Sequence, residues 1–266
     1  MKIGLSTANY FPEMNTEDMI DHYGALGIDS VEIFLNTYSE MEEGFIAMLR
    51  DRCDRYGITV NSVHVMSMIM EPCLFDLLPR RRQDFLKLFR NTLRCVRGLG
   101  SDIYTFHGVP RNMADPRYYD HLAGCYDELY ELSGEAGVRL AQENVAYLAS
   151  GDPAFLREMK SRMKQRMLHT FDIKQAIRAR VNPYDFLEVL GEDLINVHLN
   201  DHNATDNCLL PGRGTFDFSA FFRHLQAMGY AGNGILELYR QNFKDEADLM
   251  AGSRILTDAA EAIWKK

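Results

Sequence analysis

The sequence predicts an α/β protein, a single (β/α)₈ barrel in which helices alternate with eight parallel strands. Its 266 residues are about the length that such a barrel needs. Amphipathic helical stretches repeatedly end at a glycine, and a short apolar strand follows each of these glycines. No linker, low-complexity segment or second domain interrupts this pattern, so we expect one domain over residues 1–266.

The expected strands are mostly apolar and β-branched with little alternation, which is typical of strands covered by helices on both faces. They occupy residues 2–7, 30–35, 58–65, 102–107, 138–143, 167–172, 194–199 and 233–238. A doubly wound open sheet is the alternative fold. It is disfavoured because no G-x-G-x-x-G turn follows the first strand.

The expected helices carry residues that favour helix boundaries. Thr16 precedes an apolar stripe at helical spacing, and Asp152-Pro153 and Asn182-Pro183 place proline at the first helical position. A glycine is expected just past a helix because that position usually needs a positive φ. The glycines concerned are Gly27, Gly57, Gly100, Gly137 and Gly229.

The composition is that of an ordinary globular protein, with 46% hydrophobic and 25% charged residues. A net charge of −9 disfavours bulk binding to nucleic acid or to an anionic membrane, so we expect neither as a partner. No apolar run approaches the ~18–20 residues of a membrane span, and the first residues turn polar too early for a signal peptide. Five widely spaced cysteines without a C-x-x-C pair favour a reducing compartment, and we expect a cytoplasmic protein.

Polar side chains stand at the carboxyl ends of the expected strands, where a barrel of this kind builds its chemistry. They are Glu32, His64, His107, Glu143, Asp172, His198 and Glu237, with Asp201 and His202 just beyond the seventh strand. Any one of them could be a loop cap or an ion-pair partner. Together, the two Glu, one Asp and one His on the last four strands form a set of hard oxygen and nitrogen donors. Such a set suits Mn²⁺, Mg²⁺, Zn²⁺, Co²⁺ or Fe²⁺.

Short motifs along the chain resemble the xylose-isomerase-like TIM barrels of the sugar phosphate isomerase/epimerase superfamily. The motifs are HGVP, QENV, TFDIKQA, NVHLND, LPGRGTFDF and ILELY, and the resemblance runs from KIGLST to the last helix. This group includes ketose 3-epimerases, inosose dehydratases, hydroxypyruvate isomerases and endonuclease IV. The resemblance implies a divalent metal ion, whose identity (Mn, Mg, Zn or Co) stays open. Its implied ligands are Glu143, Asp172, His198 and Glu237.

The resemblance also implies an isomerase or epimerase that acts on a sugar or a sugar derivative. In that chemistry the metal ion stabilises an enediolate, while a positioned carboxylate removes the proton next to the carbonyl. Glu143 and Glu237 are implied as the acid/base pair. Carboxylates on opposite sides of one carbon would epimerise it, whereas one carboxylate that shuttles the proton would interconvert an aldose and a ketose. The sequence leaves both outcomes open.

The substrate is expected to be a small sugar or polyol. The candidates for contacts with it are His64, His107, Gln175 and Asp201. Three carboxylates, a neutral histidine and a divalent ion leave a charge of −1 (−3 + 2), which suits a neutral substrate. An anionic substrate would need a further cation, for which Arg213 between two glycines is the first candidate, ahead of Lys174 and Arg240. Whether the substrate is phosphorylated stays open.

Three other functions compete with this hypothesis. A lyase or dehydratase would abstract the same proton at the same metal and then lose a β-hydroxyl. An endonuclease IV-like DNA-repair enzyme needs a histidine where this chain has Gln175 and an Asp-x-His pair where it reads GRGTFD, so it is disfavoured. A non-catalytic accessory barrel is disfavoured because all four implied metal ligands are present.

Residues 66–75, MSMIMEPCLF, are unusually apolar for a connection at the mouth of a barrel. Such a segment should be covered. We expect either a subunit interface, and thus a possible homo-oligomer, or a lid over an apolar part of the substrate. Packing of these methionines within their own chain is the third possibility.

Overall fold

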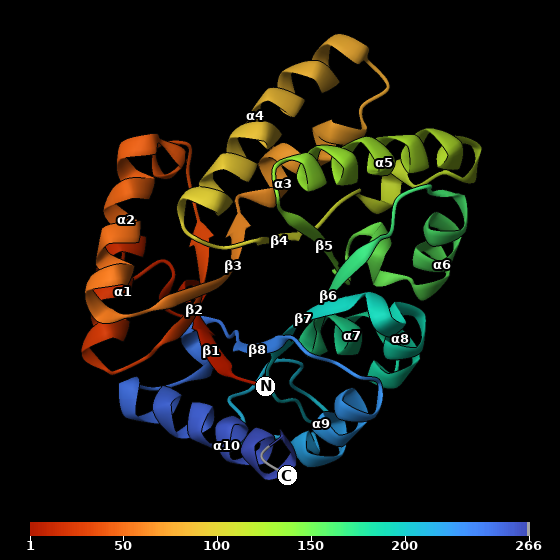
Figure 1. Cartoon of the computed structure of the whole chain (residues 1–266). Helices are drawn as coiled ribbons and strands as arrows, with labels where there is room; N and C mark the ends of the chain where they lie inside the picture. Colours follow the sequence, from red (N-terminus) through yellow and green to blue (C-terminus); the bar gives the residue numbers. More distant parts are fainter. Residues whose placement is uncertain (265–266) are drawn as a thin grey trace.

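The structure, a computed structural model, confirms a closed (β/α)₈ barrel of parallel strands (Figure 1). It describes residues 1–264, apart from the side chains of Ser67 and Met68. The strands pair in chain order, and the last closes the barrel on the first. They are β1 (Ile3–Ser6), β2 (Ser30–Leu35), β3 (Thr59–Val65), β4 (Ile103–Phe106), β5 (Arg139–Glu143), β6 (Leu168–Asp172), β7 (Leu194–Leu199) and β8 (Asn233–Leu236). Each strand lies within one of the ranges that the sequence predicts.

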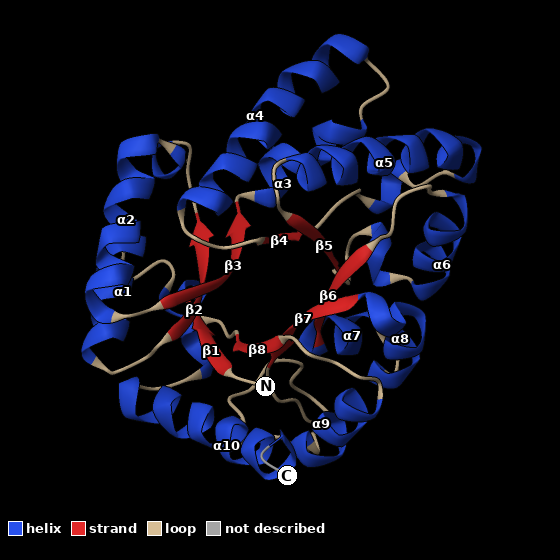
Figure 2. Ribbon diagram, in the orientation of Figure 1, coloured by secondary structure: helices blue, strands red, loops and turns tan. Residues whose placement is uncertain are grey.

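The helices form a ring around the strands (Figure 2). They are α1 (Thr16–Ala25), α2 (Glu43–Tyr56), α3 (Ser67–Met70), α4 (Pro79–Gly98), α5 (Tyr119–Glu135), α6 (Pro153–Arg162), α7 (Ile173–Ala179), α8 (Pro183–Leu190), α9 (Phe218–Ala227) and α10 (Glu246–Trp264). None of the helices in the described part of the chain is long and apolar enough to cross a bilayer.

The helix boundaries follow the local chemistry that the sequence indicates. The side chains of Asp152 and Asn182 accept hydrogen bonds from the backbone amides two residues later, at 2.8 and 3.0 Å, and so cap α6 and α8. Gly57 ends α2 in the left-handed region, with a φ of 67°. All five glycines predicted to follow helices have φ values between 67° and 78°.

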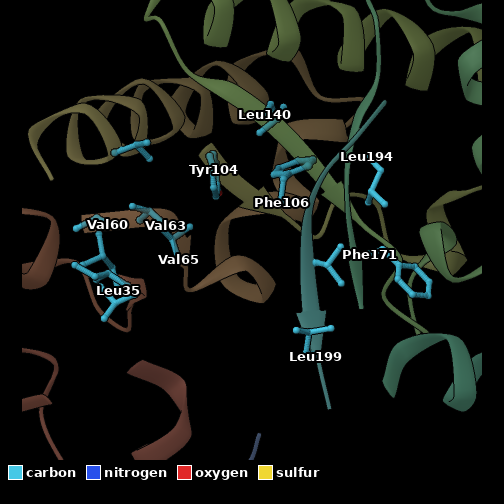
Figure 3. Close-up of a cluster of buried hydrophobic side chains, with 14 of the residues drawn as sticks. Leu35, Val60, Val63, Val65, Tyr104, Phe106, Leu140, Phe171, Leu194 and Leu199 are labelled. Atoms are coloured by element: carbon cyan, nitrogen blue, oxygen red, sulfur yellow. The ribbon is translucent and has the colours of Figure 1, made fainter. Parts of the chain in front are cut away.

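Alternate residues of the strands form an apolar layer that packs against the helices. In β2, Val31, Ile33 and Leu35 are fully buried, and Glu32 lies between the first two. Figure 3 shows further members of this layer, among them Tyr104 and Phe106 of β4. Successive residues of a strand face opposite sides of the sheet, so the residues between these apolar ones face the barrel interior.

The interior of the barrel is polar, which the largely apolar strands do not suggest. Glu32 is fully buried there, and its Oε2 accepts hydrogen bonds from Ser62 Oγ at 2.7 Å and Thr105 Oγ1 at 3.1 Å. Asn196 of β7 joins the same network. The strands therefore alternate between apolar and polar residues although both faces are buried. A buried carboxylate needs such partners, because it cannot otherwise replace the hydrogen bonds that it makes in water.

Residues 66–75 fold into α3 and a 3₁₀ helix (Glu71–Phe75), close to α4 and α5 (Figure 1). Met70, Leu74 and Phe75 are buried within the chain, which supports the third possibility for these side chains. Ile69 is 60% exposed, and Leu77 and Leu78 are exposed as well. A subunit contact or a lid formed by residues 66–75 stays a prediction.

Candidate functional site

Four side chains converge at the carboxyl ends of the last four strands. Glu143, Asp172 and His198 belong to β5, β6 and β7, and Glu237 follows β8 directly. One ligand atom from each lies within 4.8 Å of the others. The barrel topology brings these four side chains together, because parallel strands that pair in chain order have their carboxyl ends on one face.

His198 is oriented toward this cluster by Glu32. Its Nε2 lies 3.0 Å from Glu32 Oε2, and both side chains are fully buried. Its Nδ1 has no hydrogen-bond partner, although it lies 3.2 Å from Glu237 Oε2 and 3.5 Å from Glu143 Oε1. A proton on Nε2, donated to Glu32, leaves the Nδ1 lone pair directed into the cluster. This carboxylate–histidine arrangement is the one that metal-binding histidines use.

The donor set fits a divalent metal ion. Three carboxylates and one imidazole supply hard oxygen and borderline nitrogen ligands, and the unpartnered Nδ1 of buried His198 lacks the hydrogen bond that it would make in water. The four residues that the sequence implies as metal ligands could therefore hold an ion together.

Lys174 lies within the same cluster, a position that the sequence does not reveal. Its Nζ forms ion pairs with Asp172 Oδ2 and Glu237 Oε2, and the side chain is 4% exposed. Burial lowers the pKa of Lys174, but Asp172 and Glu237 outweigh it and hold that pKa well above its usual value. Burial likewise opposes the ionisation of Glu237, yet Lys174 and His198 hold the pKa of this carboxyl well below its usual range.

His64 and His107 contact Glu143 from the other side. His107 Nε2 lies 2.8 Å from Glu143 Oε2, and His64 Nε2 lies 3.4 Å from the same oxygen. Despite burial, these histidines and His198 hold the pKa of Glu143 well below its usual value. Glu143 is thus an ionised carboxylate shared between the cluster and the histidine pair.

Glu71 holds the strand end that carries His107, which sequence reasoning missed. Its Oε2 accepts hydrogen bonds from the backbone amides of His107 at 2.8 Å and Gly108 at 2.9 Å, and its Oε1 accepts one from Tyr104 Oη at 2.9 Å. The signal available in the sequence was a charged residue inside the apolar stretch of residues 66–75. A carboxylate in such a place must be paired when it is buried.

A pocket of about 410 Å³ opens next to the cluster. Its polar wall is made by His64, His107, Glu143, Lys174, Gln175 and Glu237. Its apolar wall includes Phe11, Phe34, Tyr147 and Tyr239. Glu143 and Glu237 therefore belong both to the cluster and to the pocket. Gln175, predicted to contact substrate, lines the pocket while its Oε1 accepts a hydrogen bond from the Ala146 amide at 3.1 Å.

Asp201 and Arg213 are not among the residues that line this pocket. The carboxylate of Asp201 accepts hydrogen bonds from four backbone amides of its own loop, between 2.8 and 3.0 Å. Arg213 is 50% exposed and pairs with Asp248 at 2.6 Å. The structure shows both residues in contacts of the loop after β7, and their contacts with substrate stay a prediction.

A model of the xylose isomerase-like TIM barrel family matches residues 20–259. The chain belongs to this family. An uncharacterized protein of Mycobacterium tuberculosis (strain ATCC 25618 / H37Rv) is 25% identical over 262 residues, which cover 90% of this chain and 89% of the relative.

Solved structures of the same fold include sugar epimerases. A D-tagatose 3-epimerase-like protein has a TM-score of 0.80 at 22% identity, with 100% of this chain and 99% of that chain covered. D-psicose 3-epimerase from Clostridium cellulolyticum H10, solved with D-tagatose, has a TM-score of 0.76 at 17% identity, with 99% of each chain covered. At these identities the likeness shows the barrel fold of the family.

Proposed function

We propose that this protein is a divalent-metal-dependent isomerase or epimerase of a sugar or sugar derivative, which transfers a proton next to a carbonyl group. One observation carries the proposal: Glu143 and Glu237 belong to the metal-compatible cluster and also face the pocket. Membership of the xylose isomerase-like family supports it, as does the likeness to proteins named as ketose 3-epimerases.

The roles of the residues follow from their places in the site. Glu143, Asp172, His198 and Glu237 would hold the ion, which would supply Lewis-acid polarisation of a carbonyl oxygen. Glu143 and Glu237 would be the acid/base pair, because both line the pocket beside the cluster and a positioned carboxylate can take up and return a proton. His64, His107 and Gln175 provide nitrogen and oxygen atoms for sugar hydroxyls.

The pocket also supports a small, partly apolar substrate over a polymer. Its aromatic residues Phe11, Tyr147 and Tyr239 line the pocket and are exposed. Aromatic rings with a polar group nearby suit an amphipathic ligand such as a sugar. Gln175 occupies the place where the endonuclease IV-like alternative needs a histidine, which disfavours that alternative.

Proton NMR in D₂O tests the proposal directly. Ketoses, aldoses and inososes are incubated with Mn²⁺-treated protein and with protein stripped of metal by a chelator, and each sugar is examined after the protein is removed. We expect metal-dependent deuterium incorporation next to a carbonyl. Exchange at C3 of a ketose indicates 3-epimerisation, exchange between C1 and C2 indicates isomerisation, and loss of a hydroxyl indicates the dehydratase alternative.

Two variants separate catalysis from metal binding. Glu143→Gln and Glu237→Gln should each abolish exchange, and Mn²⁺ binding measured by electron paramagnetic resonance shows whether the ion is still held. Glu188→Gln, an exposed residue of α8, is the matched control and should behave as wild type. Unchanged exchange in the Glu237→Gln variant would rule out its acid/base role.

A further inference from the structure

Lys174 occupies a position in the cluster that the proposed function does not use. It is the second residue of α7, and its backbone amide donates to Asp172 Oδ1 at 2.8 Å. Its side chain turns back so that the ammonium meets Asp172 Oδ2 and Glu237 Oε2. The cluster thus already contains one cation, supplied by the chain itself.

The two oxygens that Lys174 contacts are those directed at the centre of the cluster. Glu237 Oε2 lies 3.2 Å from His198 Nδ1, and Asp172 Oδ2 lies 3.6 Å from it. A divalent ion held by these atoms would need both oxygens at about 2.0–2.2 Å. An ammonium needs the same lone pairs for its charge-assisted hydrogen bonds. The ion and the ammonium therefore compete for the same two atoms.

We propose that Lys174 is a resident counter-cation of the cluster, and that a divalent ion must displace its ammonium from Asp172 and Glu237 in order to bind. The inference rests on the metal site of the proposed function and concerns how that site is regulated. Lysine here lowers the affinity for the ion, so the site loads only when the ion is abundant enough to displace it.

The charges explain why such a cation belongs there. Glu143, Asp172 and Glu237 are buried carboxylates within a few ångströms of one another, and buried charges without partners are costly. The three carboxylates together carry −3, and the ammonium of Lys174 reduces this to −2 (−3 + 1). The charge of Lys174 thus offsets the repulsion among the three carboxylates until a bound ion replaces it.

Once displaced, the Lys174 ammonium can contact the ring of Tyr239. Lys174 lines the pocket, and its Nζ lies 6.0 Å from the centre of the Tyr239 ring, within the range of a cation–π contact. A flexible four-carbon side chain can move from the carboxylates toward this ring without a change in the helix. The ammonium would then stand on the pocket wall as a hydrogen-bond donor.

The first test compares the affinity for Mn²⁺ in wild type and the Lys174→Met variant by electron paramagnetic resonance. Methionine keeps the length of the side chain and removes its charge. We expect the variant to bind about tenfold more tightly or better, because like charges a few ångströms apart repel strongly in a buried site. The matched control is Lys244→Met, which removes the charge of an exposed lysine that pairs with its neighbour Asp245. The Kd of this control for Mn²⁺ should stay within about twofold of the wild-type value. A change of that size is smaller than the free-energy contribution of a typical hydrogen bond.

The outcomes separate this inference from the proposed function. Wild-type binding with equal or weaker binding in Lys174→Met overturns the inference and leaves the metal site standing. Absence of binding in both proteins overturns the metal site and the inference together. Binding in the variant alone supports the inference in its strongest form.

A second test needs no substitution, and it shows whether the ion displaces the Lys174 ammonium even if the Lys174→Met variant does not fold. Wild-type protein is labelled with an amine-reactive reagent, with and without saturating Mn²⁺, and the modified lysines are located by mass spectrometry. We expect the labelling of Lys174 to rise several-fold when the ion is present, while Lys160, paired with Asp193 at 2.6 Å, should not change. Equal labelling of Lys174 in both states overturns the inference.

Discussion

Glu32 acts on the candidate metal site through a single hydrogen bond. It does not line the pocket, yet it accepts a hydrogen bond from His198 Nε2 at 3.0 Å and is itself held by Ser62 and Thr105. A carboxylate in this place fixes the tautomer of the imidazole and makes its other nitrogen a better ligand. Glu32 is therefore a positioning residue for His198.

Substitution of Glu32 by Gln should weaken metal binding without altering the pocket. The amide keeps the shape of the side chain but removes the charge that strengthens His198 as a ligand. We expect the Kd for Mn²⁺ to rise about tenfold, at the lower end of the effect of outer-shell substitutions at metal sites. Electron paramagnetic resonance titration measures it. The exposed Glu188→Gln variant should show the wild-type Kd, and an unchanged Kd in Glu32→Gln would contradict the positioning role.

At the scale of elements, Asp201 organises the long connection between β7 and α9. Its two carboxylate oxygens accept hydrogen bonds from the amides of His202, Gly212, Gly214 and Phe216. The approach at Gly214 is so close that a Cβ there would lie 2.3 Å from Asp201 Oδ1. One side chain thus joins segments more than ten residues apart, and glycine is required where the backbone passes it.

Asp201→Asn should therefore lower the free energy of unfolding. Hydrogen bonds to a charged group contribute about 1.5–3 kcal/mol each, and the amide can accept on only one of its two atoms, so we expect a loss of about 2–4 kcal/mol. Urea denaturation followed by circular dichroism measures it. Arg213→Ala removes only an exposed ion pair and should cost less than about 1 kcal/mol. A loss below 1 kcal/mol for Asp201→Asn would show that the loop is held by other contacts.

Asp193 joins two further elements and makes their contact sensitive to acid. It lies just before β7 and pairs with Lys160 of α6 at 2.6 Å and with Arg166. Burial opposes its ionisation, but the hydrogen bonds from Lys160 and Arg166 outweigh burial and lower the pKa of Asp193 below its usual 3.8. A carboxyl whose pKa is lowered by folding stabilises the native state above its unfolded pKa. That stabilisation is lost as the pH falls through the folded value.

The Asp193→Asn variant should be less stable than wild type at pH 7, by about 1–3 kcal/mol, because it lacks charged hydrogen bonds to two cations. The difference between the two proteins should shrink as the pH is lowered through 3.8 and below, since protonation then removes the charge that stabilises the wild-type protein. Urea denaturation at several pH values measures this difference. A gap that stays constant down to pH 3 would mean that Asp193 is not the titrating group.

At the scale of the whole molecule, the sequence predicts the barrel fold and the place where four site residues meet, because both depend on periodicity and strand order. The helix–glycine–strand pattern predicts the barrel, and the barrel order brings Glu143, Asp172, His198 and Glu237 to one place without knowledge of any side-chain conformation. The position of Lys174 could not be predicted in this way, because it depends on a long side chain turning back across a helix start. The roles of Asp201 and Arg213 depend on the path of an irregular loop, and no periodic pattern describes such a path.

The same convergence leads to a prediction about the stability of the whole barrel. The four candidate ligands come from β5, β6, β7 and the end of β8, so an ion bound to them links half of the closed sheet. The unfolded chain does not hold these residues together, and binding to the native state alone shifts unfolding by mass action. At about 100 times the Kd the shift is about 2.7 kcal/mol. For a chain of this length, that corresponds to a rise in Tm of roughly 5–10 °C.

Differential scanning calorimetry in a chelator and in saturating Mn²⁺ measures this rise in Tm. The rise should disappear in Asp172→Asn, because this substitution removes a ligand from the middle of the linked strands and leaves the pocket wall in place. It should persist in Glu188→Gln. A Tm that is the same with and without the ion would mean that the cluster does not bind it in the folded state. The three buried carboxylates would then be balanced by Lys174 and the histidines alone, and the acid/base chemistry of Glu143 and Glu237 would have to proceed without a metal.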